Sequence, residues 1–159
     1  ITQRDYKMGL RGVNRVMIAV NDMEKAKQQY SNLLGATFVD ASWTGEPFGI
    51  SVSISWDAGI ELCAPLPGRE KDSAVSPFLA RRGEGVMNVF FGVDDGDAAS
   101  ERASALGYGC VNALDYSQKE IDQHLGGLFN RYQEFTLDSS ARCGFAITLA
   151  RIDEKQRAE

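Results

Sequence analysis

Short apolar runs alternate with amphipathic stretches along the chain, and this order occurs twice. Residues 16–20 and residues 89–93 are rich in Val, Ile and Phe, which is typical of buried strands. Each run is followed by Asn or Asp and then by apolar residues three and four apart, a pattern that predicts a capped helix. Gly35 and Gly107 follow the two stretches, where a left-handed residue commonly ends a helix.

Each predicted helix has an apolar face, and three further strands are predicted after it. The faces consist of Met23, Ala26, Tyr30, Leu33 and Leu34 in the first helix and of Ala98, Ala99, Arg102, Ala103 and Leu106 in the second. The strands are predicted at residues 37–43, 48–56 and 59–64 in the first half and at 109–113, 132–137 and 144–151 in the second. Each half is therefore expected to be β-α-β-β-β.

These halves predict an α+β fold in which two β-α-β-β-β repeats form a curved eight-stranded sheet. The helices are expected on its outer side, and the other side is expected to form a concave cup. We expect a single domain over residues 1–159, with repeat one at about 13–65 and repeat two at about 86–151. The linker 66–85 holds a short helix at 76–80, and an insert with helical character occupies about 116–130.

The composition is that of one well-filled domain, with 159 residues of which 43% are hydrophobic. The net charge of −5 disfavours nucleic acid as a partner, because phosphate binding needs clustered Lys and Arg. No apolar run is long enough to span a membrane, so no membrane partner is expected. The 3 cysteines are widely spaced, which disfavours a disulfide framework and favours the cytoplasm. Residues 1–7 lack the pattern of a secretory signal, although a chain that begins with Ile leaves a preceding leader open.

Three segments resemble the vicinal-oxygen-chelate superfamily of glyoxalases, bleomycin-resistance proteins and extradiol dioxygenases. They are residues 13–22 (VNRVMIAVND), 59–65 (GIELCAP) and 76–86 (SPFLARRGEGV). The resemblance extends over about residues 13–151 and is closest to methylmalonyl-CoA epimerases. It implies the fold above and a homodimer, since related domains commonly pair. It does not define the reaction, because this superfamily contains isomerases, epimerases, lyases, dioxygenases and binding proteins.

In metal-dependent relatives one ligand comes from each of four strand positions, and the resemblance places these at Arg15, Glu61, Asn88 and Thr148. Only Glu61 is a good ligand. Arg15 is a permanent cation, and the neutral oxygens of Asn88 and Thr148 bind zinc, iron or manganese poorly. We therefore expect no metal and no other cofactor. The four residues would be the convergent polar groups of an otherwise apolar pocket for a small molecule.

Strand alternation supports this placement, with Arg15, Met17 and Ala19 on the cup face and Val16, Ile18 and Val20 toward the helices. Two interpretations of Arg15 and Glu61 remain open. They could form a structural salt bridge in the space of the lost metal, because a buried guanidinium needs a partner. Alternatively, Arg15 could replace the metal as the electrophile and Glu61 could act as a base, although pairing with Arg15 would weaken it in that role.

Four other residues could belong to the site. His124 is the only histidine and lies in the insert, where it is either exposed to solvent or part of a lid that brings it to a substrate as a catalytic group. Tyr116 and Tyr132 flank the insert and could bind a ligand at the entrance or pack at the rim. Cys63 is expected to face the cup, but no histidine is placed to activate it, so it is interpreted as a small apolar residue.

Two functions from different classes follow. The first is a metal-independent isomerase, epimerase or lyase that acts on a small carbonyl or acyl compound. In this enzyme Arg15 polarises the substrate oxygen, and either Glu61 or His124 of the lid moves the proton. Asn88 and Thr148 orient the substrate. The second is a non-catalytic small-molecule-binding protein of the bleomycin-resistance type, which the scarcity of acid–base groups favours.

Overall fold

The structure is a computed structural model that describes residues 9–156, so residues 1–8 and 157–159 of the predicted domain lie outside the described residues. The chain divides into two compact units. One consists of residues 15–89 and is called the 15–89 unit. The other consists of residues 9–14 together with 90–156 and is called the 90–156 unit. Strands β1 and β5 contain residues of both units.

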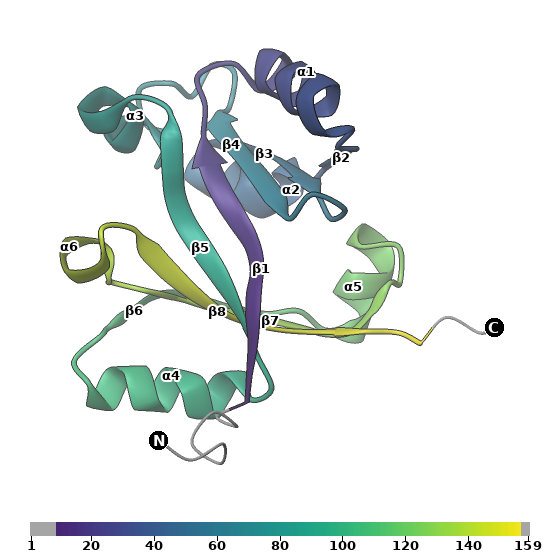
Figure 1. The fold of residues 1–159 in the computed structure, drawn as a ribbon, viewed down its shortest axis with the longest axis vertical. Helices are drawn as coiled ribbons and strands as arrows, with labels where there is room; N and C mark the ends of the chain where they lie inside the picture. The colour runs from purple at the N-terminus through teal and green to yellow at the C-terminus, as the bar shows by residue number, and fades with distance from the viewer. Residues whose placement is uncertain (1–8, 157–159) are drawn as a thin grey trace. The chain divides into compact units, whose positions relative to one another are not determined.

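The first nine elements comprise the first repeat with two short helical segments added, the linker helix and the first strand of the second repeat (Figure 1). They are β1 (Leu10–Ala19), α1 (Met23–Leu34), β2 (Val39–Asp40), α2 (Ser42–Gly45), the 3-10 helix η1 (Glu46–Phe48), β3 (Ile50–Ser55), β4 (Ile60–Pro65), α3 (Ser76–Arg82) and β5 (Gly85–Val93). Strand β1 pairs in parallel with β4, and β4 pairs antiparallel with β3.

The second half repeats the pattern. After β5, its elements are α4 (Gly96–Ala105), β6 (Cys110–Asp115), α5 (Gln118–His124), β7 (Phe129–Leu137), α6 (Ser140–Cys143) and β8 (Ala146–Glu154). Strands β6, β7 and β8 pair antiparallel in that order. The eight strands form one sheet in the order β2-β3-β4-β1-β5-β8-β7-β6, so the predicted α+β class and eight-stranded sheet of two β-α-β-β-β repeats are confirmed.

One predicted strand is largely wrong. Residues 37–43 were expected to be extended, but β2 covers only Val39–Asp40 and helix α2 begins at Ser42. The hydroxyl of Ser42 donates to Asp40 at 2.7 Å, and the hydroxyl of Thr44 donates to the Ala41 carbonyl oxygen at 2.7 Å. Short polar side chains that bond to nearby groups in this way compete with strand pairing, and the alternation of the sequence does not reveal this competition.

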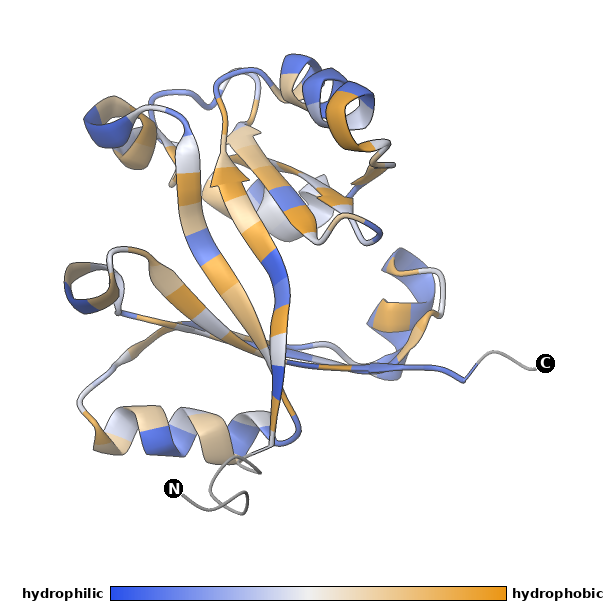
Figure 2. Cartoon of the chain, viewed as in Figure 1, coloured by the Kyte–Doolittle hydropathy of each residue, from blue (hydrophilic) through white to orange (hydrophobic). Residues whose placement is uncertain are grey.

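The predicted alternation along β1 is confirmed by the packing on its two sides. Ile18 and Val20 belong to an apolar cluster with Ala26 of α1, whereas Met17 and Ala19 belong to a separate cluster with Cys63 and Val75. Hydrophobic residues are concentrated on β1 and on the neighbouring strand β4 (Figure 2).

The predicted face of α1 is only partly buried. Met23, Ala26 and Tyr30 contact the core, but Leu33 and Leu34 are 73% and 57% exposed. The core cluster lies under the first two turns of α1, so its last turn has no apolar surface of this cluster to cover. On α4 the same distinction holds, since Ala99 and Ala103 are buried while Leu106 is 65% exposed.

Both long helices begin with an aspartate cap, as the sequence predicts. Asp22 accepts a hydrogen bond from the Lys25 amide at 3.0 Å, and Asp95 accepts one from the Ala98 amide at 3.0 Å. Helix α1 ends at Gly35 with φ 72°, in the left-handed region that favours glycine.

We expect Asp95→Ala to lower the free energy of unfolding by about 1 kcal/mol, because it leaves an amide at the start of α4 without its acceptor. Asp95→Asn keeps an oxygen acceptor and is expected to cost less. Urea unfolding of both variants beside the parent measures the difference. Equal losses in the two variants would contradict a capping role for this side chain.

Candidate functional site

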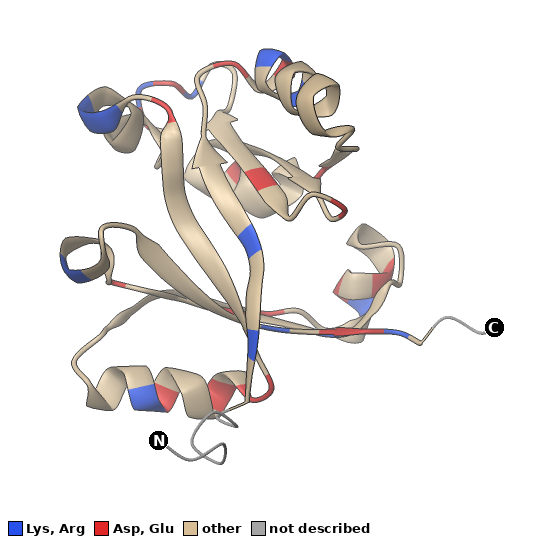
Figure 3. Ribbon diagram, viewed as in Figure 1, with Lys and Arg blue, Asp and Glu red and all other residues tan. Residues whose placement is uncertain are grey.

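Arg15 and Glu61 meet inside the 15–89 unit. The Nε atom of Arg15 lies 2.5 Å from an oxygen of Glu61, and the two side chains are 2% and 7% exposed. The parallel pairing of β1 and β4 sets Met17 opposite Glu61, which places Arg15 one step along the same face. Charged residues are otherwise uncommon on the strands of this unit (Figure 3). The salt bridge, which is one of the two interpretations left open by the sequence, is therefore present.

An aromatic ring and apolar side chains surround this pair. The Arg15 guanidinium lies 5.5 Å from the ring centroid of Trp56, close enough for a cation–π interaction. Farther along the same face, Ala19 and Cys63 are fully buried against Val75 and against Phe78 of α3. The guanidinium is thus a fixed cation in a medium that screens charge poorly, which strengthens its interaction with any negative charge nearby.

The donor set at this position does not fit a divalent cation. The Arg15 guanidinium lies against the one carboxylate that could serve as a ligand, Glu61, and it repels a metal. Between residues 9 and 156, no three His, Cys, Asp or Glu side chains are close enough to hold a metal ion. We therefore derive no chemical step through a metal at these residues.

Cys63 shares the face of Glu61 on β4 and is completely buried. Burial, with a smaller contribution from the charge of Glu61, raises the pKa of the Cys63 thiol far above its usual range. Since the thiolate is the nucleophilic form, this thiol is unsuited to nucleophilic catalysis at neutral pH. The packing agrees with the interpretation of Cys63 as a small apolar residue.

In the folded protein, a thiol reagent such as 5,5′-dithiobis(2-nitrobenzoate) is expected to modify the exposed Cys110 and to leave Cys63 unmodified. All three thiols should react once the protein is unfolded in guanidinium chloride. Peptide mass spectrometry after alkylation identifies the modified residues. Rapid labelling of Cys63 under native conditions would show that its thiol is accessible and ionised, contrary to the structure.

The 90–156 unit contains a buried polar group of its own. Thr148 on β8 is fully buried, and its hydroxyl lies 2.8 Å from that of Thr136 on β7. Register pairs Thr136 with Thr148 and Glu134 with Ala150, so Glu134, Thr136 and Thr148 share a face of the sheet. Glu134 is 7% exposed. This second buried carboxylate was missed in the sequence, because nothing in the sequence alone defines the register of the β7–β8 hairpin.

Tyr116 and Tyr132, which flank the insert, contact each other in this unit. The ring centroids of Tyr116 and Tyr132 lie 5.4 Å apart. The ring of Phe129 packs edge-on against that of Tyr132, with 5.7 Å between the centroids. Tyr132 is buried and Tyr116 is half-buried. The pair therefore packs within the unit, and its role in ligand binding stays a prediction.

His124 ends helix α5 and is exposed. The helix begins with a complete capping box between Ser117 and Glu120, and Ile121 anchors it at 1% exposure. The insert is therefore a folded helix with its own buried anchor, and the catalytic role of His124 stays a prediction.

Asn88 lies on β5 at 5% exposure, in the same unit as Arg15 and Glu61. The predicted convergence of Asn88 and Thr148 with the ion pair stays a prediction. No helix between residues 9 and 156 has both the length and the apolar character that a membrane crossing requires.

Comparison with known proteins identifies the family. The model of the glyoxalase/bleomycin resistance protein/dioxygenase superfamily matches residues 14–124, which include Arg15, Glu61 and Asn88. The chain belongs to this superfamily. Among curated proteins, no sequence matches the chain.

Solved structures of other proteins share the fold at low sequence identity. Methylmalonyl-CoA epimerase from Mycobacterium tuberculosis is 22% identical, with a TM-score of 0.69 and coverage of 94% of this chain and 92% of that one. An epimerase from Streptomyces coelicolor in complex with 2-nitronate-propionyl-CoA is 22% identical, with a TM-score of 0.68 and coverage of 89% and 97%. A hypothetical protein from Bacillus halodurans is 19% identical, with a TM-score of 0.64 and coverage of 92% and 96%. At these identities the similarity establishes the fold of this superfamily member and leaves its reaction open.

Proposed function

We propose that this chain is a metal-independent enzyme of its superfamily, an isomerase, epimerase or lyase that acts on a small carbonyl or acyl compound. The observation that carries the proposal is the buried guanidinium of Arg15, held by Glu61 and Trp56 on a strand face. Epimerases among the similar structures act on methylmalonyl-CoA, so acyl-CoA thioesters are the first compounds to test.

The chemistry assigned to the pair is proton transfer at a carbon next to a carbonyl group. A carboxylate removes the proton, the electron pair of the C–H bond forms a carbon–carbon double bond, and the π electrons of the carbonyl group move onto its oxygen. A fixed cation stabilises the resulting enolate. Return of the proton to the other face completes an epimerisation. Arg15 supplies the cation without a metal. Glu61 is a carboxylate in direct contact with this cation.

The experiment follows exchange of the α-hydrogen in D₂O for methylmalonyl-CoA and a panel of 2-oxo acids, with protein treated with EDTA. We expect exchange to survive EDTA and to fall about 100-fold or more in the double variant Arg15→Met/Glu61→Leu. The control is Arg69→Gln, which removes an exposed guanidinium that pairs with Asp72. Glu134→Gln is measured separately, because Glu134 is a second buried carboxylate. Exchange that requires stoichiometric zinc, nickel or iron would refute metal independence.

A binding protein without catalysis is the second candidate. This candidate is favoured because the opposite charges of Arg15 and Glu61 neutralise each other in a buried ion pair. Such a pair can be explained by stability alone, since a buried charge needs a partner of opposite sign. In that case the same compounds bind with a measurable heat in calorimetry and no exchange occurs. Binding that persists unchanged in the double variant would remove the pair from both functions.

The proposal includes a small-molecule ligand, a homodimer and a cytoplasmic location. The dimer is supported by the two edge strands of the sheet, which expose Val39 of β2 at 54% and Val111 of β6 at 65%. Edge strands with exposed apolar residues commonly pair with another chain. Analytical ultracentrifugation over a range of concentrations tests it. The cytoplasmic location is supported by the three cysteines, all free in the structure.

A further inference from the structure

An apolar cavity lies beneath helix α4 in the 90–156 unit and is called the α4 cavity. Its volume is about 400 Å³, and its lining includes Ala103, Leu106, Leu137, Ile147 and Leu149. The buried positions of α4 that line the cavity are Ala99 and Ala103, whose small side chains leave space between the helix and strands β7 and β8. The volume is within the range of small-molecule pockets.

The rim of the cavity is apolar and open to solvent. Leu106 is 65% exposed and Leu10 is 62% exposed, and both line the cavity. An apolar concavity that remains open in a folded domain costs stability and marks a place where an apolar group can bind.

Two arginines lie beside this cavity. Arg102 belongs to its lining. The guanidinium of Arg142 lies 4.6 Å from the ring centroid of Tyr108 and donates to the Leu106 carbonyl oxygen at 3.4 Å, and Tyr108 and Leu106 both line the cavity. The contact with Tyr108 orients Arg142 before any ligand arrives.

Neither of these arginines forms an ion pair with a carboxylate between residues 9 and 156. Five other arginines of the same stretch do: Arg11, Arg15, Arg69, Arg131 and Arg151. In a chain of net charge −5, two cations without carboxylate partners beside an apolar cavity are complementary to an anion with an apolar body.

We propose that the α4 cavity binds a monocarboxylate with an apolar chain, such as a medium-chain fatty acid. The chain occupies the space between α4, β7 and β8, and the carboxylate lies at the rim against Arg102 and Arg142. Arginine suits this role because its guanidinium donates two parallel hydrogen bonds to a carboxylate. This site lies wholly within the 90–156 unit, and the inference does not depend on the proposed function.

The test is calorimetric titration of the full chain with decanoate and, in parallel, with decanol, which has the same chain but no charge. We expect one decanoate per chain and binding about tenfold or more weaker for decanol. Ala103→Leu places a bulkier side chain in the cavity while keeping a good helix former, and is expected to weaken both ligands about tenfold or more. Arg102→Gln/Arg142→Gln is expected to weaken decanoate to the level of decanol and to leave decanol unchanged.

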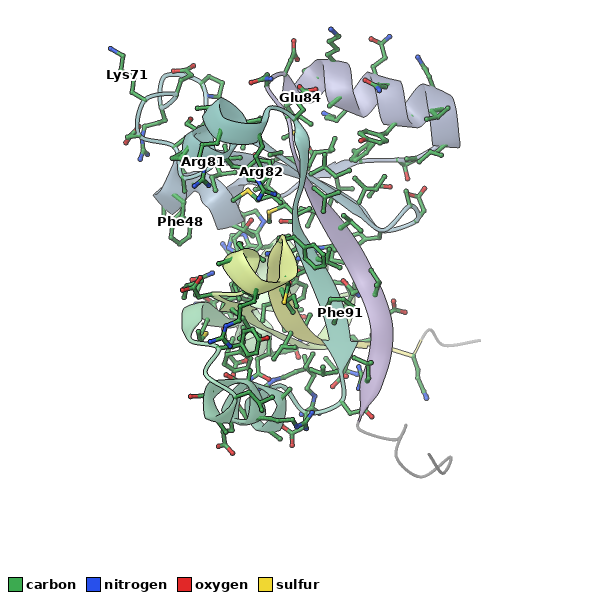
Figure 4. The ribbon with its side chains drawn as sticks, turned by 60° about the vertical axis from the view of Figure 1, so that its left-hand side comes forward. Phe48, Lys71, Arg81, Arg82, Glu84 and Phe91 are labelled. Carbon is green, nitrogen blue, oxygen red and sulfur yellow. The ribbon has the colours of Figure 1, made fainter. Side chains whose placement is uncertain are left out.

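The matched control is Arg81→Gln, because Arg81 is an exposed cation on α3 in the other unit (Figure 4). Circular dichroism of each variant shows that it is folded. Equal binding of decanoate by the parent and by Ala103→Leu overturns the proposal, as does the absence of binding to the parent. A change of oligomeric state in Ala103→Leu without ligand binding to the parent also overturns it, since a second copy of the chain would then cover the cavity.

Discussion

Arg15→Ala is expected to lower the free energy of unfolding by about 3–5 kcal/mol, because it leaves the Glu61 carboxylate buried without its cation. The side chains are 2% and 7% exposed, so water cannot replace the lost partner without a rearrangement of the strands. The double variant Arg15→Met/Glu61→Leu removes both charges and should recover most of this loss, because packed apolar residues tolerate the site better than one unpaired charge. Urea unfolding of both variants measures the effect.

An exposed ion pair provides the control for this comparison. Arg69 and Asp72 are 40% and 62% exposed, and Arg69→Ala is expected to change stability by no more than about 0.5 kcal/mol. If Arg15→Ala were as mild as Arg69→Ala, the ion pair would not be buried in solution. If the double variant were as unstable as Arg15→Ala, the packing around Trp56 and Cys63 would depend on the charges themselves. The same double variant serves the exchange assay, so loss of activity can be separated from loss of folding.

Leu62→Ala is expected to lower the free energy of unfolding by about 2–5 kcal/mol. Leu62 is completely buried and belongs to the cluster of Val20, Ala26 and Ile60, where truncation leaves a cavity that the strands cannot close. Leu33→Ala makes the same chemical change at a side chain that is 73% exposed, and should change stability by no more than about 0.5 kcal/mol. Chemical unfolding at equal protein concentration compares them. A large loss in Leu33→Ala would indicate that the end of α1 is covered in solution, for example by a second copy of the chain.

The two halves of the fold could be predicted because their signals are local. Asp22 and Asp95 each accept a bond from an amide three residues ahead, and Gly35 has the left-handed conformation that ends its helix. Such contacts depend on a few neighbouring residues, which the sequence displays directly. The short strand β2 could not be predicted, since the hydroxyl contacts of Ser42 and Thr44 compete with strand pairing that involves distant residues.

The candidate site was predictable where it depended on residue chemistry. A permanent cation and a carboxylate on neighbouring inward strand positions require one another, and the structure brings Arg15 and Glu61 into contact. Glu134 was missed because its burial depends on how β7 pairs with β8. A shift of one residue in that pairing would reverse the face of every side chain.

The sequence by itself determined the order of the elements, their caps and, through resemblance, the family, since each follows from patterns that the sequence displays. Tertiary structure alone decided which apolar positions are covered, with Leu62 in the core and Leu33 in solvent. It also decided that the small residues of α4 leave a cavity bordered by Arg102. The physical reason is that burial, register and unfilled volume depend on how segments far apart in the sequence pack against one another. A local sequence pattern does not contain that information.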